Sequence, residues 1–159
     1  MSPVVTDETD HPGTITAAAV TGRWELAEWH TVDQTGAVTA HPFGVHAAGT
    51  LTYTPAGFMA GQLAAEHRTP LATVDPLGGS AAERADAYST YVAYYGRYEI
   101  RGDTIVHQVQ SSLFPNWVGD AQLRYATLAD DVLILRTPSL EVAGSTTISE
   151  LRWTRAEAW

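Results

Sequence analysis

The segment from Val106 to Arg124 carries a histidine and an arginine on two β-patterned runs that flank an aromatic, proline-containing corner. Side chains alternate between the two faces of a strand. One face of the first run holds Ile105, His107, Val109 and Ser111. This face is the more apolar, which predicts that His107 points inward.

A neutral imidazole transfers protons near pH 7, so His107 is a candidate acid or base toward a carbonyl or hydroxyl. The alternative is a structural histidine, satisfied by Ser111 or by a neighbouring strand.

Arg124 lies on the second run, and its role depends on the register of that strand. The register that buries Leu128 turns Arg124 and Gln122 inward, whereas the opposite register buries Leu123 and Tyr125. A buried guanidinium is costly without an anionic partner. An inward Arg124 therefore predicts either an acidic group on the ligand or a developing oxyanion or enolate. In the outward register it is a solvated surface charge.

Other polar and aromatic side chains are candidates for contact with a ligand. A tyrosine beside a cavity offers a hydrogen bond at one end and apolar contact along its ring. The predicted ligand-contacting residues are Tyr53, Met59, Tyr98, Ser111, Asn116, Trp117 and Gln122. Packing in the core is the alternative for Tyr53, Met59 and Tyr98, and a rigid packed corner is the alternative for Asn116 and Trp117.

The elements that must position these residues are short and β-patterned. The predicted strands are Gly22 to Val32, Gly49 to Tyr53, Phe58 to Leu63, Gly96 to Arg101, Thr104 to Leu113, Ala121 to Leu128, Val132 to Thr137, and Ser145 to Thr154. Short joints with turn residues make consecutive strands antiparallel neighbours. The fold class is therefore mainly β, an eight-stranded antiparallel up-and-down barrel whose interior accepts one small ligand. A sandwich is the competing architecture.

One segment breaks this pattern. Ser80 and Glu83 have the spacing of a capping box, and small or aromatic residues recur at helical intervals until Gly96, which predicts one helix over about residues 81–95. The preceding stretch, Ala64 to Gly79, has no clear periodicity. It is either a lid near the barrel mouth or a flexible connection.

The first and last predicted strands carry residues that could close one end of the barrel. Trp24 opens the first strand, and the last strand carries Arg152 and Arg155. First and last strands are neighbours in a closed barrel. A guanidinium over an indole face is favourable by about 0.5–2 kcal/mol, so one of these arginines is predicted to seal the closed end against Trp24.

Length, charge and hydropathy limit the number of domains and the partners that this protein can have. The chain has 159 residues, enough for one domain, which we place at residues 18–159 after a flexible leader at 1–17. Its formal charge of −9 disfavours nucleic acid and anionic membrane surfaces as partners. There is no secretory signal pattern and no apolar run of about 18 residues, which predicts no membrane partner and a cytoplasmic location. The oligomeric state is left open.

Motifs for metals and cofactors are absent from the sequence. With no cysteine there is no thiolate nucleophile and no sulfur-ligated metal site. The histidines at positions 30, 41, 46 and 67 match no established ligand spacing, so we predict no metal site. There is no hydrolase elbow, phosphate-binding loop or dinucleotide-binding turn, so we predict no cofactor.

Several short motifs, in order along the chain, resemble the lipocalin-like domain family. They are Gly22-Arg23-Trp24, Pro42-Phe43-Gly44, Gly49-Thr50-Leu51-Thr52-Tyr53, Gly57-Phe58-Met59, Phe114-Pro115-Asn116-Trp117-Val118-Gly119 and Leu135-Arg136-Thr137-Pro138. The glycine-tryptophan start is shared by other β-barrel families, whereas the Phe-Pro-Asn-Trp corner is specific. The resemblance implies a calycin-type barrel of bacterial or fungal origin, associated with secondary metabolism. It supplies no established set of catalytic residues.

Two functions fit these observations. The first is a cofactor-independent cyclase or isomerase that holds a small, largely hydrophobic polyketide- or terpenoid-like intermediate in reactive geometry, with His107 and Arg124 as catalytic residues. The alternative is a carrier that binds a small hydrophobic metabolite without converting it. We favour the enzyme at this point, because an inward histidine and arginine provide more polarity than a passive apolar carrier needs.

Overall fold

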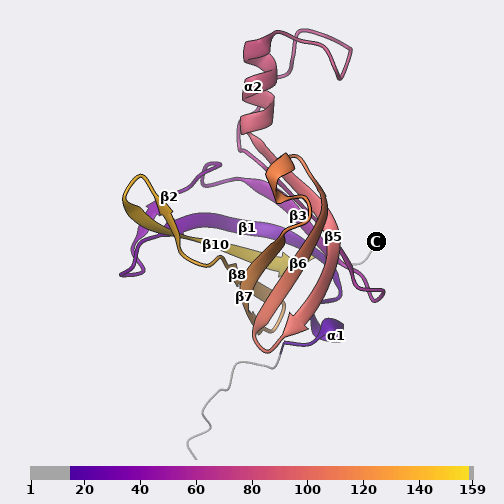
Figure 1. Cartoon of the computed structure of the whole chain (residues 1–159), viewed down its shortest axis with the longest axis vertical. Helices are drawn as coiled ribbons and strands as arrows, with labels where there is room; N and C mark the ends of the chain where they lie inside the picture. Colours follow the sequence, from indigo (N-terminus) through magenta and orange to yellow (C-terminus); the bar gives the residue numbers. More distant parts are fainter. Residues whose placement is uncertain (1–14, 158–159) are drawn as a thin grey trace, which may run out of the picture.

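A closed antiparallel β-barrel forms the body of the protein in the computed structural model, which describes residues 15–157 (Figure 1). Its eight strands are β1 (Gly22–Val32), β3 (Ala48–Tyr53), β4 (Phe58–Ala64), β5 (Tyr91–Arg101), β6 (Thr104–Ser112), β7 (Ala121–Ala129), β8 (Val132–Arg136) and β10 (Ser145–Arg155). Each strand pairs with the next of these along the chain, and β1 pairs with β10 to close the barrel. The predicted up-and-down barrel is confirmed, and the sandwich is excluded.

Two short strands extend the barrel wall. β2 (Val38–Ala40) pairs with the end of β1, and β9 (Leu140–Val142) pairs with the start of β10. Sequence patterning did not predict either one, because three-residue strands are too short to display an alternating pattern.

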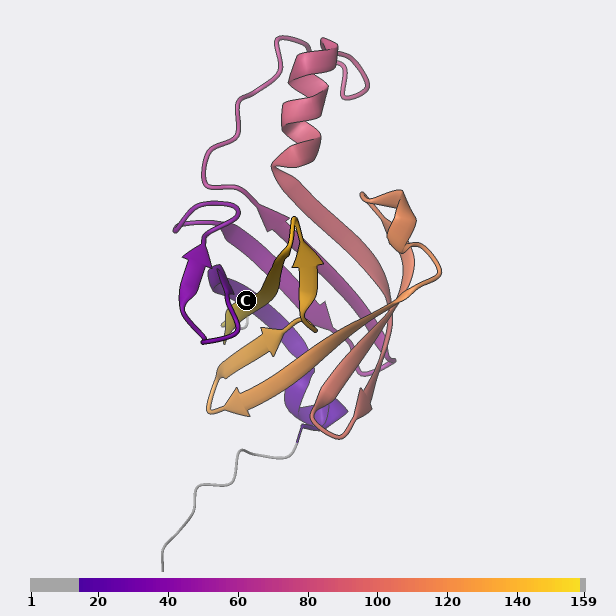
Figure 2. The same ribbon diagram turned by 60° about the vertical axis from the view of Figure 1, so that its left-hand side comes forward.

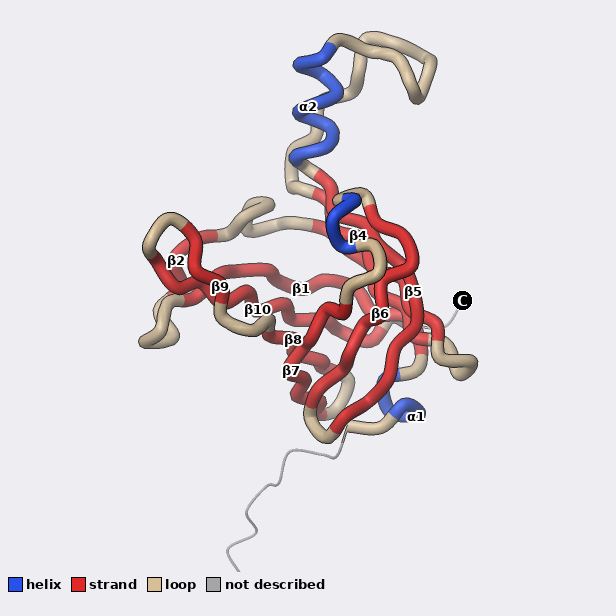
Figure 3. The backbone as a smooth tube through the Cα atoms, viewed as in Figure 1, coloured by secondary structure: helices blue, strands red, loops and turns tan. Residues whose placement is uncertain are grey.

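Within the described part of the chain, three short helices lie outside the barrel wall (Figure 3). They are α1 (Ala17–Val20), α2 (Ala81–Ser89) and the 3₁₀ helix η1 (Pro115–Trp117). α1 and η1 lie at opposite ends of the barrel (Figure 2). Among the described residues, no helix is both long enough and apolar enough to cross a bilayer.

The predicted helix is shorter than expected. α2 begins with the predicted capping box, in which the Ser80 hydroxyl accepts from the Glu83 backbone and the Glu83 carboxylate accepts from the Ser80 backbone. It ends at Ser89, however, and residues 91–95 belong to β5. The prediction of a helix to residue 95 was therefore wrong. Tyr91 and Val92 are aromatic and β-branched, and β5 gains a full ladder with β4 by starting there.

The segment before α2 does not cover the barrel. Both views show this loop and α2 projecting away from the barrel (Figures 1 and 2). The loop packs against the helix instead: the Arg68 guanidinium donates to the Ala87 carbonyl, and Glu83 accepts from the Ala72 backbone. α2 has no buried residue. In this arrangement the stretch from Ala64 to Gly79 is an arm that extends from the barrel, and it does not act as a lid.

The closed end of the barrel is built around Trp24. The Arg155 guanidinium carbon lies 4.3 Å from the centre of the indole ring. The same guanidinium donates to the carbonyl oxygens of Ala19 and Thr21, and its Nε donates to Asp131. The predicted closure is therefore made by Arg155, because Arg152 is exposed on the other face of β10.

The segment from Ile15 to Val20, which includes α1, packs into this closed end of the barrel. Val20 is fully buried, and its carbonyl accepts from the Trp24 indole N–H. Ile15 is also part of the buried core, so the last residues of the predicted leader pack against the barrel. Residues 1–14 of that leader lie outside the described residues.

A bulge in β1 decides which side chains face the barrel interior. The pairing of β1 with β10 shifts between Leu26 and Glu28, which leaves Ala27 as an extra residue. Without that residue, the alternation that buries Trp24 and Leu26 would also turn Glu28 inward. With it, Trp29 faces inward and Glu28 lies on the outer face, near His30.

Candidate ligand-binding cavity

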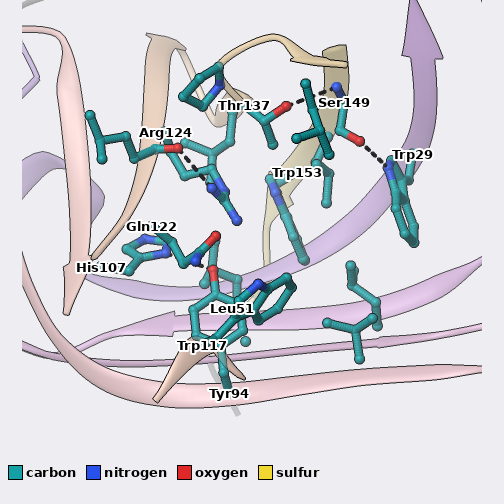
Figure 4. Close-up of a pocket in the computed structure, with 18 of the residues that line it drawn as sticks. Trp29, Leu51, Tyr94, His107, Trp117, Gln122, Arg124, Thr137, Ser149 and Trp153 are labelled. Carbon is teal, nitrogen blue, oxygen red and sulfur yellow. Dashed lines mark hydrogen bonds between the residues drawn. The ribbon is translucent and has the colours of Figure 1, made fainter. Parts of the chain in front are cut away.

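The half of the barrel nearer η1 is hollow. It encloses a cavity of about 570 Å³, a size that suits one small molecule (Figure 4). The lining is mostly apolar and aromatic, with Trp29, Leu51, Leu63, Val92, Trp117, Leu135, Leu151 and Trp153 among its members. The opposite half is filled by the core around Trp24. The barrel is thus solid at one end and open to a ligand at the other.

His107 forms part of the floor of this cavity. It is only 1% exposed, and each ring nitrogen contacts one tyrosine. Its Nε2 lies 2.7 Å from the Tyr53 hydroxyl, and its Nδ1 lies 2.8 Å from the Tyr94 hydroxyl. Burial, and to a lesser extent the positive charge of Arg124, lowers the pKa of His107 to about 3. The imidazole is therefore neutral at pH 7, with one N–H and one acceptor nitrogen.

Burial also decides which tyrosine donates to which nitrogen. Tyr53 is almost fully buried, and its only partner among the described residues is His107. If Tyr53 accepted from the imidazole, its own O–H would be buried without an acceptor, which is costly. We therefore assign the Tyr53 O–H as donor to Nε2 and Nδ1–H as donor to Tyr94. This leaves the O–H of Tyr94, which lines the cavity, free to donate to a ligand.

The Tyr53 hydroxyl stays protonated in this arrangement. Burial is the main cause that raises the pKa of Tyr53 well above its usual value, and the neighbouring Tyr94 and Tyr98 raise it further. Tyr53 and His107 thus carry no charge at neutral pH.

Arg124 projects into the cavity from β7 (Figure 4). The observed register is the one that turns Gln122, Ala126 and Leu128 inward, while Leu123 and Tyr125 are exposed. The guanidinium Nη1 donates to the Leu123 carbonyl at 2.8 Å. Among the described residues, no carboxylate lines the cavity or pairs with Arg124. Arg124 is the one charged side chain of the described lining, because His107 is neutral.

Two indole N–H groups of the lining differ in their partners. The Trp29 Nε1 donates to the Ser149 hydroxyl at 3.3 Å. The Trp153 Nε1 is buried and has no acceptor among the described residues. Trp153 is 3% exposed and forms part of the cavity wall.

The structure brings four of the predicted site residues to the cavity wall: His107, Arg124, Trp117 and Gln122. His107 and Gln122 are direct cross-strand partners on β6 and β7. The Trp117 ring packs edge-on against Tyr94, with ring centres 5.6 Å apart. η1 therefore contributes an aromatic side chain to the cavity.

The other five predicted residues lie elsewhere. Tyr53, Met59 and Tyr98 are buried in the core beneath the cavity, where Tyr98 donates to the Thr54 carbonyl. Ser111 lines a separate, smaller pocket of about 180 Å³. Asn116 is exposed on η1. For Tyr53 the connection to the cavity is indirect, through His107.

Among the cavity residues that sequence reasoning missed are three aromatic ones, Tyr94, Trp153 and Trp29. Tyr94 falls in the stretch predicted as helix, although Val92, Tyr94 and Tyr98 show the alternation of a strand. Trp153 follows Ser149 and Leu151 on the inward face of β10, and the period-two pattern of that strand could have identified it. Trp29 could not be identified in this way, because the bulge at Ala27 reverses the alternation before it.

Three of the described histidines outside the cavity, His30, His41 and His67, lie close to carboxylates. His30 Nε2 lies 3.5 Å from Glu150, and His41 Nε2 lies 3.5 Å from Glu28. Within residues 15–157, no three histidine, aspartate or glutamate side chains are grouped in a way that could hold a metal ion.

Comparison with known proteins agrees with this geometry. The family model of the lipocalin-like domain matches residues 21–156, which includes every barrel strand. The chain belongs to the lipocalin-like domain family. The 4'-hydroxy-3'-methoxypropiophenone carrier protein of Aspergillus oryzae (strain ATCC 42149 / RIB 40) is 34% identical to this lipocalin-like chain over 86 residues, covering 48% of this chain and 78% of the relative. No solved structure matches significantly. A lipocalin-like barrel of this kind binds a small hydrophobic molecule.

Proposed function

We propose that this lipocalin-like protein is a carrier that binds one small, largely hydrophobic metabolite in its barrel and releases it unchanged. The observation that carries the proposal is the 570 Å³ cavity with an apolar and aromatic wall. Apolar surface that a ligand removes from water contributes about 25 cal/mol per Å², so such a wall supplies affinity without any chemical step.

The state of His107 supports binding over catalysis. An effective general base has a pKa near the working pH. The pKa of His107 is lowered to about 3, and both ring nitrogens already contact tyrosine hydroxyls. The imidazole therefore fits the role of holding Tyr94 in place better than the role of taking a proton from a substrate.

The relative in Aspergillus oryzae supports the same choice. It is named as a carrier of 4'-hydroxy-3'-methoxypropiophenone, a planar aryl ketone with a phenol. A molecule of this size and shape suits the cavity, and the aromatic lining of Trp29, Trp117 and Trp153 suits a planar ring. Our proposal for this chain is the ligand class, a small planar hydrophobic metabolite of secondary metabolism.

The test uses 4'-hydroxy-3'-methoxypropiophenone as the probe. Titration should quench tryptophan fluorescence in a saturable way with one site per chain, because three of the five tryptophans line the cavity. After prolonged incubation, extraction and mass spectrometry should recover the probe unchanged. Saturable binding followed by conversion of the probe would contradict the carrier proposal.

A second candidate function is a cofactor-independent cyclase or isomerase, with Arg124 and His107 as its predicted catalytic residues. The observation that favours it is Arg124, whose guanidinium projects into the cavity near the linked pair of Tyr94 and His107. Such a donor is suited to stabilising a developing enolate oxygen. This function requires a product, so the same mass spectrometry with a reactive polyketide- or terpenoid-like substrate separates the two candidates. Loss of product in both Arg124→Met and His107→Gln would favour the enzyme.

A further inference from the structure

Three polar groups of the cavity wall present a donor to a ligand. A guanidinium can only donate, and the Arg124 guanidinium satisfies just one N–H through the Leu123 carbonyl. The Trp153 N–H also can only donate, and it is buried without an acceptor in residues 15–157. The Tyr94 hydroxyl already accepts from His107 in the arrangement that burial favours, so its O–H donates toward the cavity. Other polar side chains of the wall offer both donors and acceptors, so they do not discriminate between ligands; they are Gln62, Gln122, Thr137, Ser139, Thr147 and Ser149.

The cavity carries a positive charge, which favours the same kind of ligand as these donors do. The chain carries 18 acidic and 9 basic residues, yet no aspartate or glutamate occurs in the described lining. The bulge at Ala27 contributes to this, because it keeps Glu28 on the outer face and places Trp29 inside. Arg124 therefore faces a low-polarity cavity without a compensating carboxylate. An unpaired guanidinium in such surroundings is costly, and an anionic ligand removes that cost.

We propose that the ligand carries an anionic oxygen group, a carboxylate or an ionised acidic phenol or enol, which binds Arg124 with help from the Tyr94 O–H and the Trp153 N–H. This inference rests on the proposed function and specifies the chemical class of its ligand. The remainder of the ligand is a planar apolar body, which contacts Trp117 and the leucines of the cavity wall. A charged hydrogen-bonded pair is stronger than a neutral one, so the anionic group provides selectivity.

The test compares two ligands of the same shape and different charge. A neutral fluorescent probe, 1-aminoanthracene, is first bound in the cavity, and it is then displaced at pH 7 by 2-naphthoate or by 2-naphthamide. We expect the wild-type protein to bind 2-naphthoate at least tenfold more tightly than 2-naphthamide. Arg124→Met, which keeps the apolar length of the side chain, should reduce this ratio to about one. Its loss of affinity should be larger for 2-naphthoate than for 1-aminoanthracene.

Two further variants make the test specific. Arg152→Met removes an exposed arginine of β10 and should leave the ratio unchanged, which controls for the net charge of the protein. Trp153→Phe removes the unpartnered N–H and keeps an aromatic ring. It should weaken binding of 2-naphthoate several-fold more than it weakens binding of 1-aminoanthracene.

The outcomes distinguish this inference from the function on which it rests. If neither naphthalene compound nor 1-aminoanthracene binds the wild-type protein, both the carrier proposal and the inference are wrong. If 1-aminoanthracene binds but wild-type protein does not prefer 2-naphthoate, the inference alone is wrong. The same conclusion follows if the preference survives in Arg124→Met. Should Arg124→Met not fold, the wild-type ratio and Arg124→Gln still decide the question.

Discussion

The hydroxyl of Tyr53 lies 2.7 Å from Nε2 of His107, where the solid half of the barrel meets the hollow half. Below this contact, the Tyr53 and Tyr98 rings pack edge-on, with centres 4.8 Å apart. Above it, His107 holds the hydroxyl of Tyr94 at the cavity wall. A hydrogen-bonded chain of three rings therefore connects the core to the ligand site.

Tyr53→Phe should destabilise the protein. The variant keeps the ring but leaves Nε2 of the buried His107 without a donor, and an unsatisfied buried group costs about 1–3 kcal/mol. We expect urea denaturation to show a loss of about this size in the free energy of unfolding. Tyr125→Phe, which removes an exposed hydroxyl on β7, is the control and should change stability by less than about 0.5 kcal/mol. Equal stability of the two variants would contradict the assigned hydrogen bond.

His107 should make stability depend on pH in the acidic range. Its pKa is about 3 in the folded protein and about 6.5 in the unfolded chain, so between these values only the unfolded chain binds the proton. Above pH 6.5 the group contributes no pH dependence. As the pH falls below 6.5, it lowers the free energy of unfolding by about 1.4 kcal/mol per pH unit, until the folded state is also protonated near pH 3.

The comparison of wild type with His107→Gln isolates this contribution, because other titrating groups act in both proteins. At pH 7 the wild type should be the more stable of the two. By pH 5 its advantage should have shrunk by about 2 kcal/mol. An advantage that stays constant between pH 7 and pH 5 would show that the imidazole titrates normally in the folded protein.

Arg155→Met should weaken the closed end of the barrel. The substitution removes the charge over the Trp24 ring and the hydrogen bonds to Ala19, Thr21 and Asp131. Contacts of this kind together stabilise a fold by about 2–3 kcal/mol, and thermal or urea unfolding should register the loss. Arg152→Met, three strand positions earlier and exposed, should have little effect. Ligand affinity should be nearly unchanged in both, since neither arginine lines the cavity.

Gly96→Ala should disrupt the pairing of β5 with β6. A Cβ atom at this position would lie 1.9 Å from the Gln108 carbonyl oxygen, at the point where the register of the two strands shifts. A backbone clash of this size requires the strands to separate, so we expect a loss of more than about 3 kcal/mol or failure to fold. Gly61→Ala is the matched control, because its Cβ would meet Leu51 at an ordinary 3.5 Å. A stable, soluble Gly96→Ala protein would contradict the observed register.

The barrel could be predicted from sequence because its signals are local. Alternation and turn residues identified all eight barrel strands, and the inward direction of His107 followed from the same pattern. The end of α2 could not be predicted, because Tyr91 and Val92 continue a helical spacing until pairing with β4 overrides it.

The cavity was only partly predictable, because it depends on long-range geometry. The extra residue Ala27 reverses the alternation in β1, and nothing in its local sequence marks a bulge. The register of β7 was ambiguous from sequence, since either face carries apolar residues. Only pairing with β6 places Gln122 opposite His107 and turns Arg124 inward. Which tyrosines meet His107 likewise depends on contacts across the barrel.

Titration of the wild-type protein with 1-aminoanthracene tests the central claim, that the hollow half of the barrel binds a small apolar molecule. Excitation of the tryptophans should produce energy transfer to the bound probe, because Trp29, Trp117 and Trp153 line the cavity. We predict saturation at one probe per chain, with transfer reduced in Trp117→Leu. Absence of binding up to the solubility of the probe, or unsaturable binding that Trp117→Leu leaves unchanged, would contradict the account.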